Sequence, residues 1–223
     1  MTAKLFFSAI LKFLLGAVLV GALIFLPAGT LNYTGGIIFM CVLFIPMFIV
    51  GIVMMIKSPS LLSKRLDAKE KESEQSIVVK LSGLMFVVGF ILAGLDFRFG
   101  WIKLPIGVNI VATVVFIIAY VLYAEVLREN AYLSRTIEVQ EGQKVVDTGL
   151  YGIVRHPMYA VTLALFLSMP LILGSIFSFI AFLAYPFIIA LRIRNEEKVL
   201  TEGLEGYAEY KERVKYRLIP FIW

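Results

Sequence analysis

Long apolar runs separated by short polar connections dominate the chain. Four of them, residues 5–26, 36–56, 77–97 and 104–126, reach the length of about 20 apolar residues that a helix needs to cross the hydrocarbon core of a bilayer. None of the runs alternates between apolar and polar positions, which disfavours a transmembrane barrel. The pattern therefore predicts four spanning helices.

A fifth apolar stretch, residues 158–191, is too long for a single crossing. Gly174 and Ser175 stand at its middle, and this residue pair is typical of a turn. We therefore expect a helical hairpin over residues 157–191, in which two shorter helices meet at the Gly-Ser pair.

The tail, residues 192–223, begins with an amphipathic segment. Between residues 192 and 214, apolar side chains recur at helical spacing, and Gly203 and Gly206 interrupt the segment. We expect two short helices, divided near these glycines, that lie along the membrane surface and cover the structure beneath them. Their apolar face consists of Leu200, Leu204, Tyr207, Tyr210 and Val214.

The connection between the second and third runs, residues 57–76, is highly charged. It alternates Lys and Arg with Asp and Glu, above all over residues 67–72. A mixture of this kind is usually a solvated helix, stabilised by pairs of opposite charge three and four residues apart. We interpret the connection as a structural loop.

The basic residues predict how the chain is oriented. Arg98 and Lys103 belong to the connections on one side of the membrane, whereas the other nineteen Lys and Arg residues lie at the N-terminus, at 57–80, at 128–155 and in the tail. Because basic residues are enriched on the cytoplasmic side, we expect the N-terminus, both long loops and the tail in the cytoplasm. The protein would be a multi-pass integral membrane protein, in the cell membrane if its host is bacterial.

Composition supports this interpretation and excludes others. Hydrophobic residues make up 60% of the chain and charged residues 17%, which suits a protein dissolved in lipid better than a soluble domain. The net charge of +5 comes without a basic stripe interleaved with aromatics, so we expect no nucleic-acid partner. A single cysteine, Cys41, and a single histidine imply neither a disulfide nor a metal site.

The expected fold is all-α and polytopic. Residues 1–126 would form a transmembrane scaffold of four helices with a cytoplasmic loop at 57–76. Residues 127–223 would form a second region, made of a loop, the helical hairpin at 157–191 and the cytoplasmic amphipathic tail at 192–223.

Residues suited to chemistry gather in this second region, in three motifs. A hairpin returns its second end beside its first, so the two motifs at its ends should meet at the inner membrane surface. The three motifs are Asp147-Thr148-Gly149-Leu150-Tyr151, Arg155-His156-Pro157-Met158-Tyr159 and Arg192-Ile193-Arg194-Asn195-Glu196-Glu197.

The second motif predicts an anion site at a helix start. A residue before proline avoids helical geometry and proline suits the first helical turn, so we expect the helix to begin at Pro157 with His156 just outside it. The free N–H groups of that turn, with Arg155, would attract a carboxylate or phosphate.

The third motif carries negative charge and predicts a site for cations or hydrogen-bond donors. Glu196 and Glu197 at the edge of lipid require cations or donors, such as a ligand amine, a ribose diol or Arg194. S-adenosylmethionine is one cofactor with an anionic end, a cationic end and a ribose, and its sulfonium suits the faces of Tyr151 and Tyr159.

Each motif also has a purely structural interpretation. His156 would cap the hairpin helix, and the arginines would be anchors on the positive side of the membrane. Glu196 and Glu197 would be solvated acids that pair with those arginines, and the tyrosines would belong to an interfacial aromatic belt.

From about residue 127 to 223, the sequence resembles the isoprenylcysteine carboxyl methyltransferases and the related phospholipid methyltransferases. The resemblance rests on Thr148-Gly149-Leu150-Tyr151-x-x-x-Arg155-His156-Pro157-Met158-Tyr159, on Arg194-x-Glu196-Glu197-x-x-Leu200, and on Gly206-Tyr207-x-x-Tyr210 with Val214-x-Tyr216-Arg217-Leu218-Ile219-Pro220. It implies an S-adenosylmethionine pocket, closed by the tail helices. The implied lining is Gly149, Leu150, Tyr151, His156, Tyr159, Glu196 and Glu197.

The resemblance also implies where the methyl acceptor binds. Arg128, at the inner end of the fourth span, takes the position of an arginine that handles the acceptor group, and Asn130 and Arg135 would assist it as catalytic residues. The acceptor would enter sideways from the lipid. A prenylated-cysteine carboxylate, a lipid amine such as that of a phospholipid, a lipid carboxylate and another isoprenoid remain open as acceptors, and the oligomeric state is not readable from the sequence.

Two other functions compete with methyl transfer. Membrane sterol or steroid reductases that use NADPH carry a similar Arg-His-Pro-x-Tyr box, but with asparagine where this chain has Met158, and the Glu196-Glu197 pair is nearer the methyltransferase pattern. A transporter or assembly factor would show repeated halves or midplane charges. We find no repeat, and Lys12 and Glu125 lie near the ends of their runs.

Overall fold

The computed structural model describes residues 3–66, 73–133 and 137–223, and within these ranges it is helical with no strand. The acidic and basic run at 67–72 and the candidate catalytic residue Arg135 lie outside the described residues. The protein is a polytopic helical membrane protein, as the sequence predicts.

Four long apolar helices match the four predicted spans. They are α1 (Ala3–Ala28), α2 (Thr34–Lys57), α4 (Ser73–Phe99) and α5 (Ile106–Glu129), and each is long and apolar enough to cross a bilayer. A short helix, α3 (Pro59–Leu66), follows α2 in the polar connection. The predicted spans are therefore confirmed, with a few more residues at their ends.

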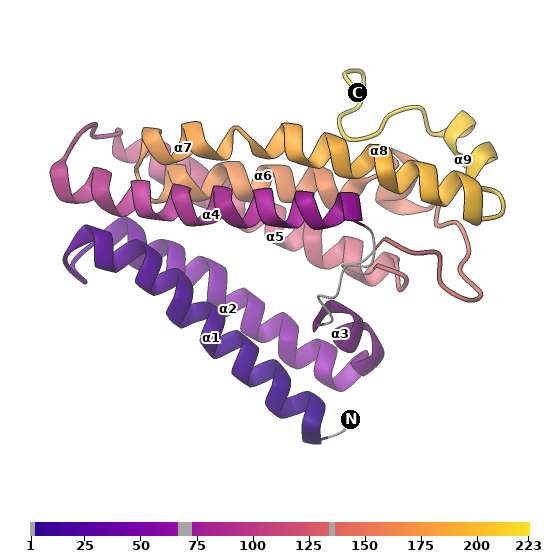
Figure 1. Ribbon diagram of the computed structural model, residues 1–223, viewed down its shortest axis with the longest axis horizontal. Coiled ribbons are helices and arrows are strands. Elements are labelled where there is room, and N and C mark those ends of the chain that lie inside the picture. The colour runs from indigo at the N-terminus through magenta and orange to yellow at the C-terminus, as the bar shows by residue number, and fades with distance from the viewer. Residues whose placement is uncertain (1–2, 67–72, 134–136) are drawn as a thin grey trace.

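The predicted hairpin is also confirmed. Helix α6 (Pro157–Ile172) runs to the turn, and α7 (Ile176–Phe182) and α8 (Tyr185–Gly203) return beside it (Figure 1). Ser175 begins the return, since its hydroxyl accepts a hydrogen bond of 3.1 Å from the backbone N–H of Ser178 and so caps α7.

The tail differs from the expectation at its start. Residues 192–203 do not form a separate surface helix but continue α8 to Gly203, because no glycine or proline interrupts the chain between residues 187 and 202. The division near the glycines is confirmed: Gly206 has a left-handed φ of 81°, and α9 (Tyr207–Arg213) starts directly after it. The expected apolar face is confirmed too, since Leu204, Tyr207, Tyr210 and Val214 form one buried cluster with Leu200 packed against it.

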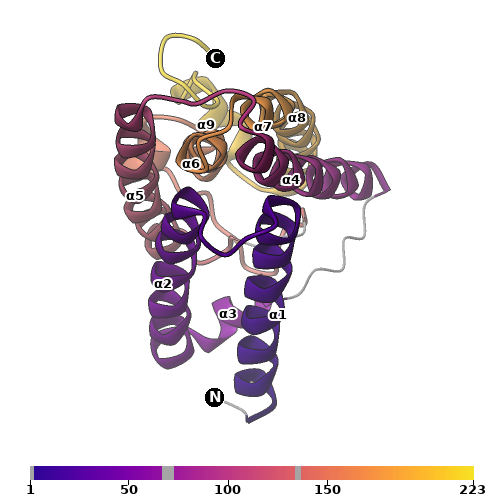
Figure 2. The ribbon, with the colours of Figure 1, turned by 90° about the vertical axis from the view of Figure 1, so that its left-hand side faces the viewer.

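Helices α4 to α8 form the main bundle, and α1 and α2 lie along one side of it (Figures 1 and 2). Large side chains such as Phe39, Phe116 and Phe182 are fully buried between the helices. The outside is apolar as well, with Val18 70% exposed and Phe187 76% exposed, which fits a protein surrounded by lipid.

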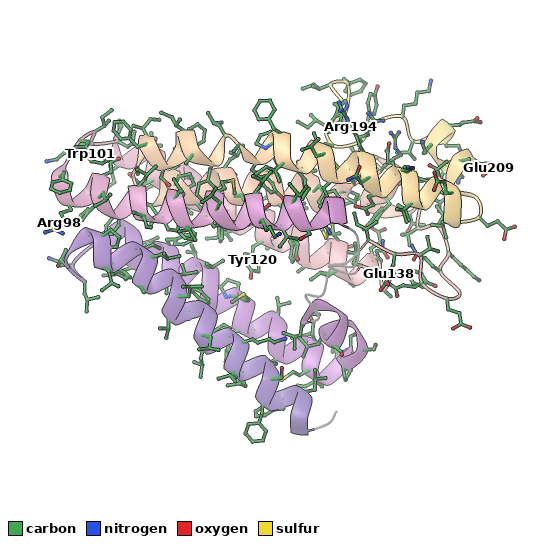
Figure 3. All side chains as sticks on the ribbon, in the orientation of Figure 1. Arg98, Trp101, Tyr120, Glu138, Arg194 and Glu209 are labelled. Carbon is green, nitrogen blue, oxygen red and sulfur yellow. The ribbon has the colours of Figure 1, made fainter. Side chains whose placement is uncertain are left out.

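The two ends of the bundle differ in chemistry. At the hairpin-turn end, the buried carboxylate of Asp96 accepts hydrogen bonds from the Ser175 hydroxyl (2.6 Å) and the Ile102 N–H (3.2 Å), which ties the α4–α5 connection to the turn. At the opposite end, the start of α6, the end of α8, α9 and the connection after α5 come together. Figure 3 places Glu138 and Glu209 at that end and Arg98 and Trp101 at the turn end.

Candidate functional site

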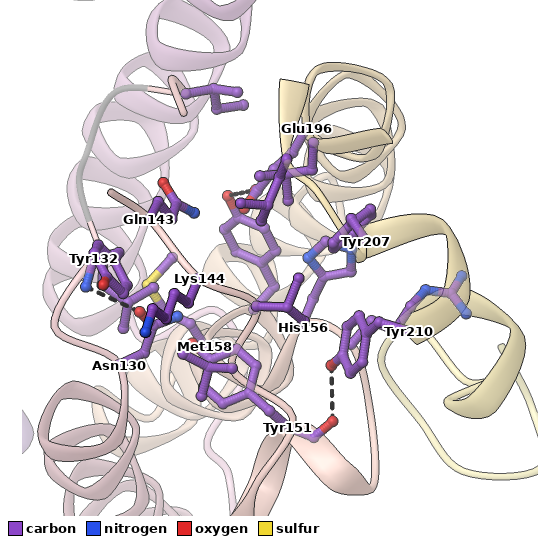
Figure 4. Close-up of a pocket in the computed structure, with 18 of the residues that line it drawn as sticks. Asn130, Tyr132, Gln143, Lys144, Tyr151, His156, Met158, Glu196, Tyr207 and Tyr210 are labelled. Carbon is purple, nitrogen blue, oxygen red and sulfur yellow. Dashed lines mark hydrogen bonds between the residues drawn. The ribbon is translucent and has the colours of Figure 1, made fainter. Parts of the chain in front are cut away.

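A pocket opens at the end of the bundle that carries α9 (Figure 4). Counted together with the open solvent at its mouth, the space between its atoms is about 810 Å³. Its walls are the described parts of the connection after α5, residues 130–133 and 137–146, the start of α6, one face of α8, and α9. The lining residues are Asn130, Tyr132, Leu133, Ile137, Glu138, Gln143, Lys144, Val145, Val146, Tyr151, Arg155, His156, Met158, Tyr159, Arg192, Glu196, Leu200, Leu204, Tyr207 and Tyr210.

The start of α6 forms the floor of the site. Pro157 is the first helical residue, and His156 precedes it in a non-helical conformation, as the sequence predicts. The His156 side chain makes no capping bond to α6. The backbone N–H groups of Arg155 and His156 instead donate to the carbonyls of Tyr216 and Arg217, both at 2.9 Å, so a later segment of the chain is paired with the floor.

Behind the pocket, the buried carboxylate of Glu197 collects three basic side chains. Its Oε1 lies 2.7 Å from Arg155 Nε and 3.3 Å from His156 Nε2, and its Oε2 lies 3.0 Å from Arg217 Nε. Only 5% of the Glu197 side chain is exposed. A buried charge is tolerated when it is paired and hydrogen-bonded in this way.

The Arg155 side chain donates hydrogen bonds to other groups of the protein. Besides its bond to Glu197, its Nη1 donates to the backbone carbonyls of Val214 (2.7 Å) and Lys215 (2.9 Å). Arg155 therefore joins α6, α8 and the segment at 214–217. Its Nε and Nη1 groups thus support the back wall of the pocket that the side chain also lines.

Glu196 faces the opposite way from its neighbour, because successive residues on a helix are about 100° apart. It lines the pocket, where it accepts a hydrogen bond from the Tyr159 hydroxyl. Arg192 Nε donates to the same hydroxyl at 2.9 Å. The Tyr159 ring also stacks on the His156 ring, with 5.7 Å between ring centres. These four side chains form one polar wall.

Helix α9 supplies two buried tyrosines to the pocket. The Tyr210 hydroxyl donates to the Tyr151 carbonyl at 2.7 Å. The Tyr207 hydroxyl is buried and has no hydrogen-bond partner among the residues that the structure describes. Burial raises the pKa of both phenols above the ordinary value, and for Tyr207 the charges of Glu197 and Glu196 add to the effect. Both hydroxyls therefore stay protonated and able to donate.

The turn before Tyr151 depends on a carboxylate at the end of α5. Residues Gly149–Gly152 form a short 3₁₀ helix. Glu129 holds it, since its Oε1 accepts from the Thr148 hydroxyl (3.0 Å) and its Oε2 from the Leu150 N–H (3.2 Å). Gly149 has a φ of +48°, and a Cβ at this position would overlap the Glu129 carboxylate. Gly149 and Leu150 thus position Tyr151 and do not line the pocket themselves.

The structure gathers six of the twelve candidate residues in the pocket lining. Asn130 joins the pocket lining together with five of the proposed cofactor residues. Glu197 is buried behind the pocket. Arg194 is exposed on α8 and Arg128 is exposed at the end of α5, where it forms a two-bond ion pair with Glu125 (2.6 and 2.8 Å); neither lines the pocket. The five are Tyr151, Arg155, His156, Tyr159 and Glu196.

The connection at 130–146 contributes residues that the sequence did not single out, among them Tyr132, Gln143 and Lys144. Local bonds join its two described parts, residues 130–133 and 137–146: the Tyr132 hydroxyl donates to the Gly142 carbonyl at 3.1 Å, and Gln140 Nε2 donates to the Tyr132 carbonyl at 2.6 Å. Structure held by such bonds produces no periodic pattern of apolar residues, so the sequence did not reveal it. The helical spacing of Tyr207 and Tyr210 in the sequence predicted an apolar packing face, and it did not predict that both residues line the pocket.

The pocket combines charged groups with an apolar wall. Glu196 offers an acceptor, Arg192 and Lys144 are basic, and Ile137, Val145, Leu200 and Leu204 cover the remaining surface. Among the described residues, no group of three His, Cys, Asp or Glu side chains is placed to hold a metal ion. The site suits an organic ligand with a flat apolar part and charged ends.

Known proteins are similar in sequence to the region of the chain that forms the pocket. Residues 106–205 match the family model described as phospholipid methyltransferase. A curated relative, the Delta(14)-sterol reductase TM7SF2 of Mus musculus, is 31% identical over 91 residues, which are 40% of this chain and 22% of the reductase. The chain thus spans about a fifth of the length of that relative. The residues that match the phospholipid methyltransferase model, 106–205, carry α5 to α8 and most of the pocket.

Proposed function

We propose that the protein is an S-adenosylmethionine-dependent methyltransferase that acts on a lipid-borne acceptor at the cytoplasmic face of its membrane. The family match over residues 106–205 supports methyl transfer. The observation that carries the proposal is the pocket between α8 and α9, in which Glu196 meets an apolar wall beside Tyr207, whose buried hydroxyl has no hydrogen-bond partner among the described residues.

The residues of the pocket fit this cofactor. A buried hydroxyl without a partner costs free energy unless a ligand satisfies it, so Tyr207 would donate to the cofactor. Glu196 would accept from its amine or its ribose hydroxyls, and Lys144 would meet its carboxylate. Leu200 and Leu204 would cover the adenine. The bound cofactor supplies a methyl group on a positively charged sulfur, which the ring faces of Tyr151 and Tyr159 favour.

The Glu197 network has a supporting role in this proposal. Arg155 and His156 hold the carboxylate of Glu197, and Arg217 closes it from the other side. Held this way, the end of α8 keeps Glu196 directed into the pocket. Arg155 and Glu197 would therefore shape the cofactor site rather than touch the cofactor.

The acceptor side of the proposal lies at the end of α5. Asn130 lines the pocket and would contact the acceptor group. Arg128 would do so only after leaving its ion pair with Glu125. Methyl transfer requires little acid–base help but needs the acceptor atom in line with the methyl group and away from water. A phospholipid-like amine or an isoprenylcysteine-like carboxylate would meet this requirement by entering from the bilayer.

The orientation is part of the proposal. Nineteen of the 21 Lys and Arg residues belong to the segments on the pocket side of the spans or to the chain beyond them. The positive-inside rule therefore puts the pocket, the N-terminus and the tail in the cytoplasm, which is where S-adenosylmethionine is made. In a bacterial host this membrane would be the cell membrane.

A sterol-type reductase is the second candidate, because one curated protein with a similar sequence is a Delta(14)-sterol reductase. Arg192 and Lys144 would then bind the phosphates of NADPH. Met158 speaks against this candidate, since it lines the pocket at the position where asparagine is expected in the reductases.

The proposed activity is testable in isolated membranes. Membranes that contain the protein, supplied with S-adenosylmethionine labelled in its methyl group, should transfer the label to their lipid-soluble fraction. The Glu196→Gln variant should not, whereas Glu202→Gln, an exposed position on the same helix, should behave as the parent. Absence of label from the lipids and from every lipid-modified protein of these membranes would contradict the proposal.

A further inference from the structure

A small loop at residues 218–223 exposes large apolar side chains outside the spanning helices. Phe221 is 88% exposed and Ile222 is 77% exposed, more than the lipid-facing Val18 at 70%. Neither residue belongs to a helix. Such exposure in water is unfavourable, so the two side chains require a partner.

The loop has a fixed shape. The carbonyl of Trp223 accepts hydrogen bonds from the N–H groups of Arg217, Leu218 and Ile219, at 2.9, 2.9 and 3.2 Å. Leu218 is buried in the main core, and Trp223 packs against the same core. Phe221 adopts a φ of +66°, which is uncommon for a residue other than glycine. The loop is therefore attached to the bundle and presents Phe221 and Ile222 outward.

The position of the loop follows from the backbone. The N–H groups of Arg155 and His156 donate to the carbonyls of Tyr216 and Arg217, so the chain enters the loop beside the first turn of α6. That turn marks the level at which the hairpin begins. Figure 1 agrees, since the end of the chain lies beside α8 and not beyond α9.

The neighbouring groups fit a lipid surface. Lys215, three residues before the start of the loop, is exposed, and the Arg217 guanidinium lies over the Trp223 ring at 5.3 Å. Tyr216 packs its ring against that of Phe221, with 5.2 Å between centres. Aromatic and basic side chains together are typical of the zone between lipid headgroups and acyl chains.

We propose that the 218–223 loop is a membrane anchor, in which Phe221 and Ile222 insert into the bilayer surface beside α8 while Lys215 faces the lipid phosphates. The inference does not depend on the proposed methyl transfer. The anchor would connect the bilayer to the Glu197 network behind the pocket. The segment that leads into the loop contributes Arg217, which binds Glu197, and the Val214 and Lys215 carbonyls, which accept from Arg155.

Spin labelling measures the depth of the loop directly. The single cysteine, Cys41, is replaced by Ser, and single labels are then attached at Phe221→Cys, at Val18→Cys as a lipid-facing control and at Glu209→Cys as a water-facing control. In proteoliposomes, the ratio of oxygen to nickel-chelate accessibility at residue 221 should approach that at residue 18 and exceed that at residue 209 several-fold. A ratio equal to that at residue 209 would overturn the inference, as would low accessibility to both reagents, which would mean that protein covers the loop.

A second variant removes the concern that the label itself draws the loop into lipid. In the double variant Phe221→Asp and Ile222→Asp, insertion is unfavourable, so trypsin should cleave the reconstituted protein after Lys215 several-fold faster than the parent. Both proteins should be cut at equal rates in detergent without lipid. Equal rates in the bilayer would contradict the anchor.

Discussion

Glu196 and Glu197 are neighbours in the chain but lie on opposite sides of the pocket wall. Glu196 faces the pocket and accepts from the Tyr159 hydroxyl, whereas Glu197 is buried behind it against Arg155, His156 and Arg217. The two carboxylates should therefore respond differently to substitution, the first in ligand binding and the second in stability.

Replacing Glu197 by alanine should destabilise the fold. The change leaves Arg155 buried without its carboxylate, and removing one partner of a buried ion pair typically costs about 3–5 kcal/mol. Thermal unfolding in detergent measures the loss. Glu202→Ala, an exposed position on α8, is the matched control and should stay within about 0.5 kcal/mol of the parent. Equal unfolding temperatures for the two variants would count against the network.

Replacing Glu196 by glutamine should leave unfolding nearly unchanged and weaken cofactor binding. A hydrogen bond to a charged group contributes about 1.5–3 kcal/mol, so the dissociation constant for S-adenosylhomocysteine should rise by about tenfold or more. Calorimetric titration measures it, with Glu202→Gln as the control. Parent-like affinity in Glu196→Gln would remove this residue from the proposed site.

The two tyrosines of α9 offer a paired test of the unpartnered hydroxyl. Tyr207→Phe removes a buried polar group that has no partner among the described residues, so stability should hold or rise while affinity for S-adenosylhomocysteine falls. Tyr210→Phe removes the bond to the Tyr151 carbonyl and should cost about 1 kcal/mol of stability. A reversed pattern, with stability lost only in Tyr207→Phe, would mean that the Tyr207 hydroxyl is structural.

Gly149 should tolerate a side chain only if Glu129 moves. In Gly149→Ala the backbone is left-handed and the new Cβ meets the Glu129 carboxylate. Gly142→Ala is the control, because its φ of +70° imposes similar backbone strain, about 1–2 kcal/mol, but nothing lies within 4 Å of its Cβ. We expect the Gly149 variant to lose more stability than the control. In a Glu129→Ala background, Gly149→Ala should cost no more stability than Gly142→Ala does, and an unchanged excess there would show that the overlap is not its cause.

Most of the fold could be predicted because lipid imposes a simple rule on sequence: a spanning helix is a long apolar run. The same rule located the hairpin turn at Gly174 and Ser175. It missed the continuation of α8 to Gly203, because a helix that leaves the membrane changes composition without ending, and the change at Arg192 was interpreted as a boundary.

The site was harder to predict than the fold. Two features could be predicted: Pro157 indicated the start of α6, and the hairpin pattern indicated that His156 and Glu196 lie close together. Which of two adjacent glutamates faces the pocket depends on helix rotation, and the sequence does not record it. The turn of Arg128 toward Glu125 and the contact between residues 130–133 and 137–146 depend on individual hydrogen bonds, which leave no periodic pattern in the sequence.

Calorimetry on the purified protein in detergent, with S-adenosylhomocysteine and NADPH titrated separately, tests the central claim most directly. We expect S-adenosylhomocysteine to bind to the parent, to bind at least about tenfold more weakly to Glu196→Gln, and NADPH to give no binding heat. NADPH binding without S-adenosylhomocysteine binding would contradict the proposed methyltransferase and favour the reductase.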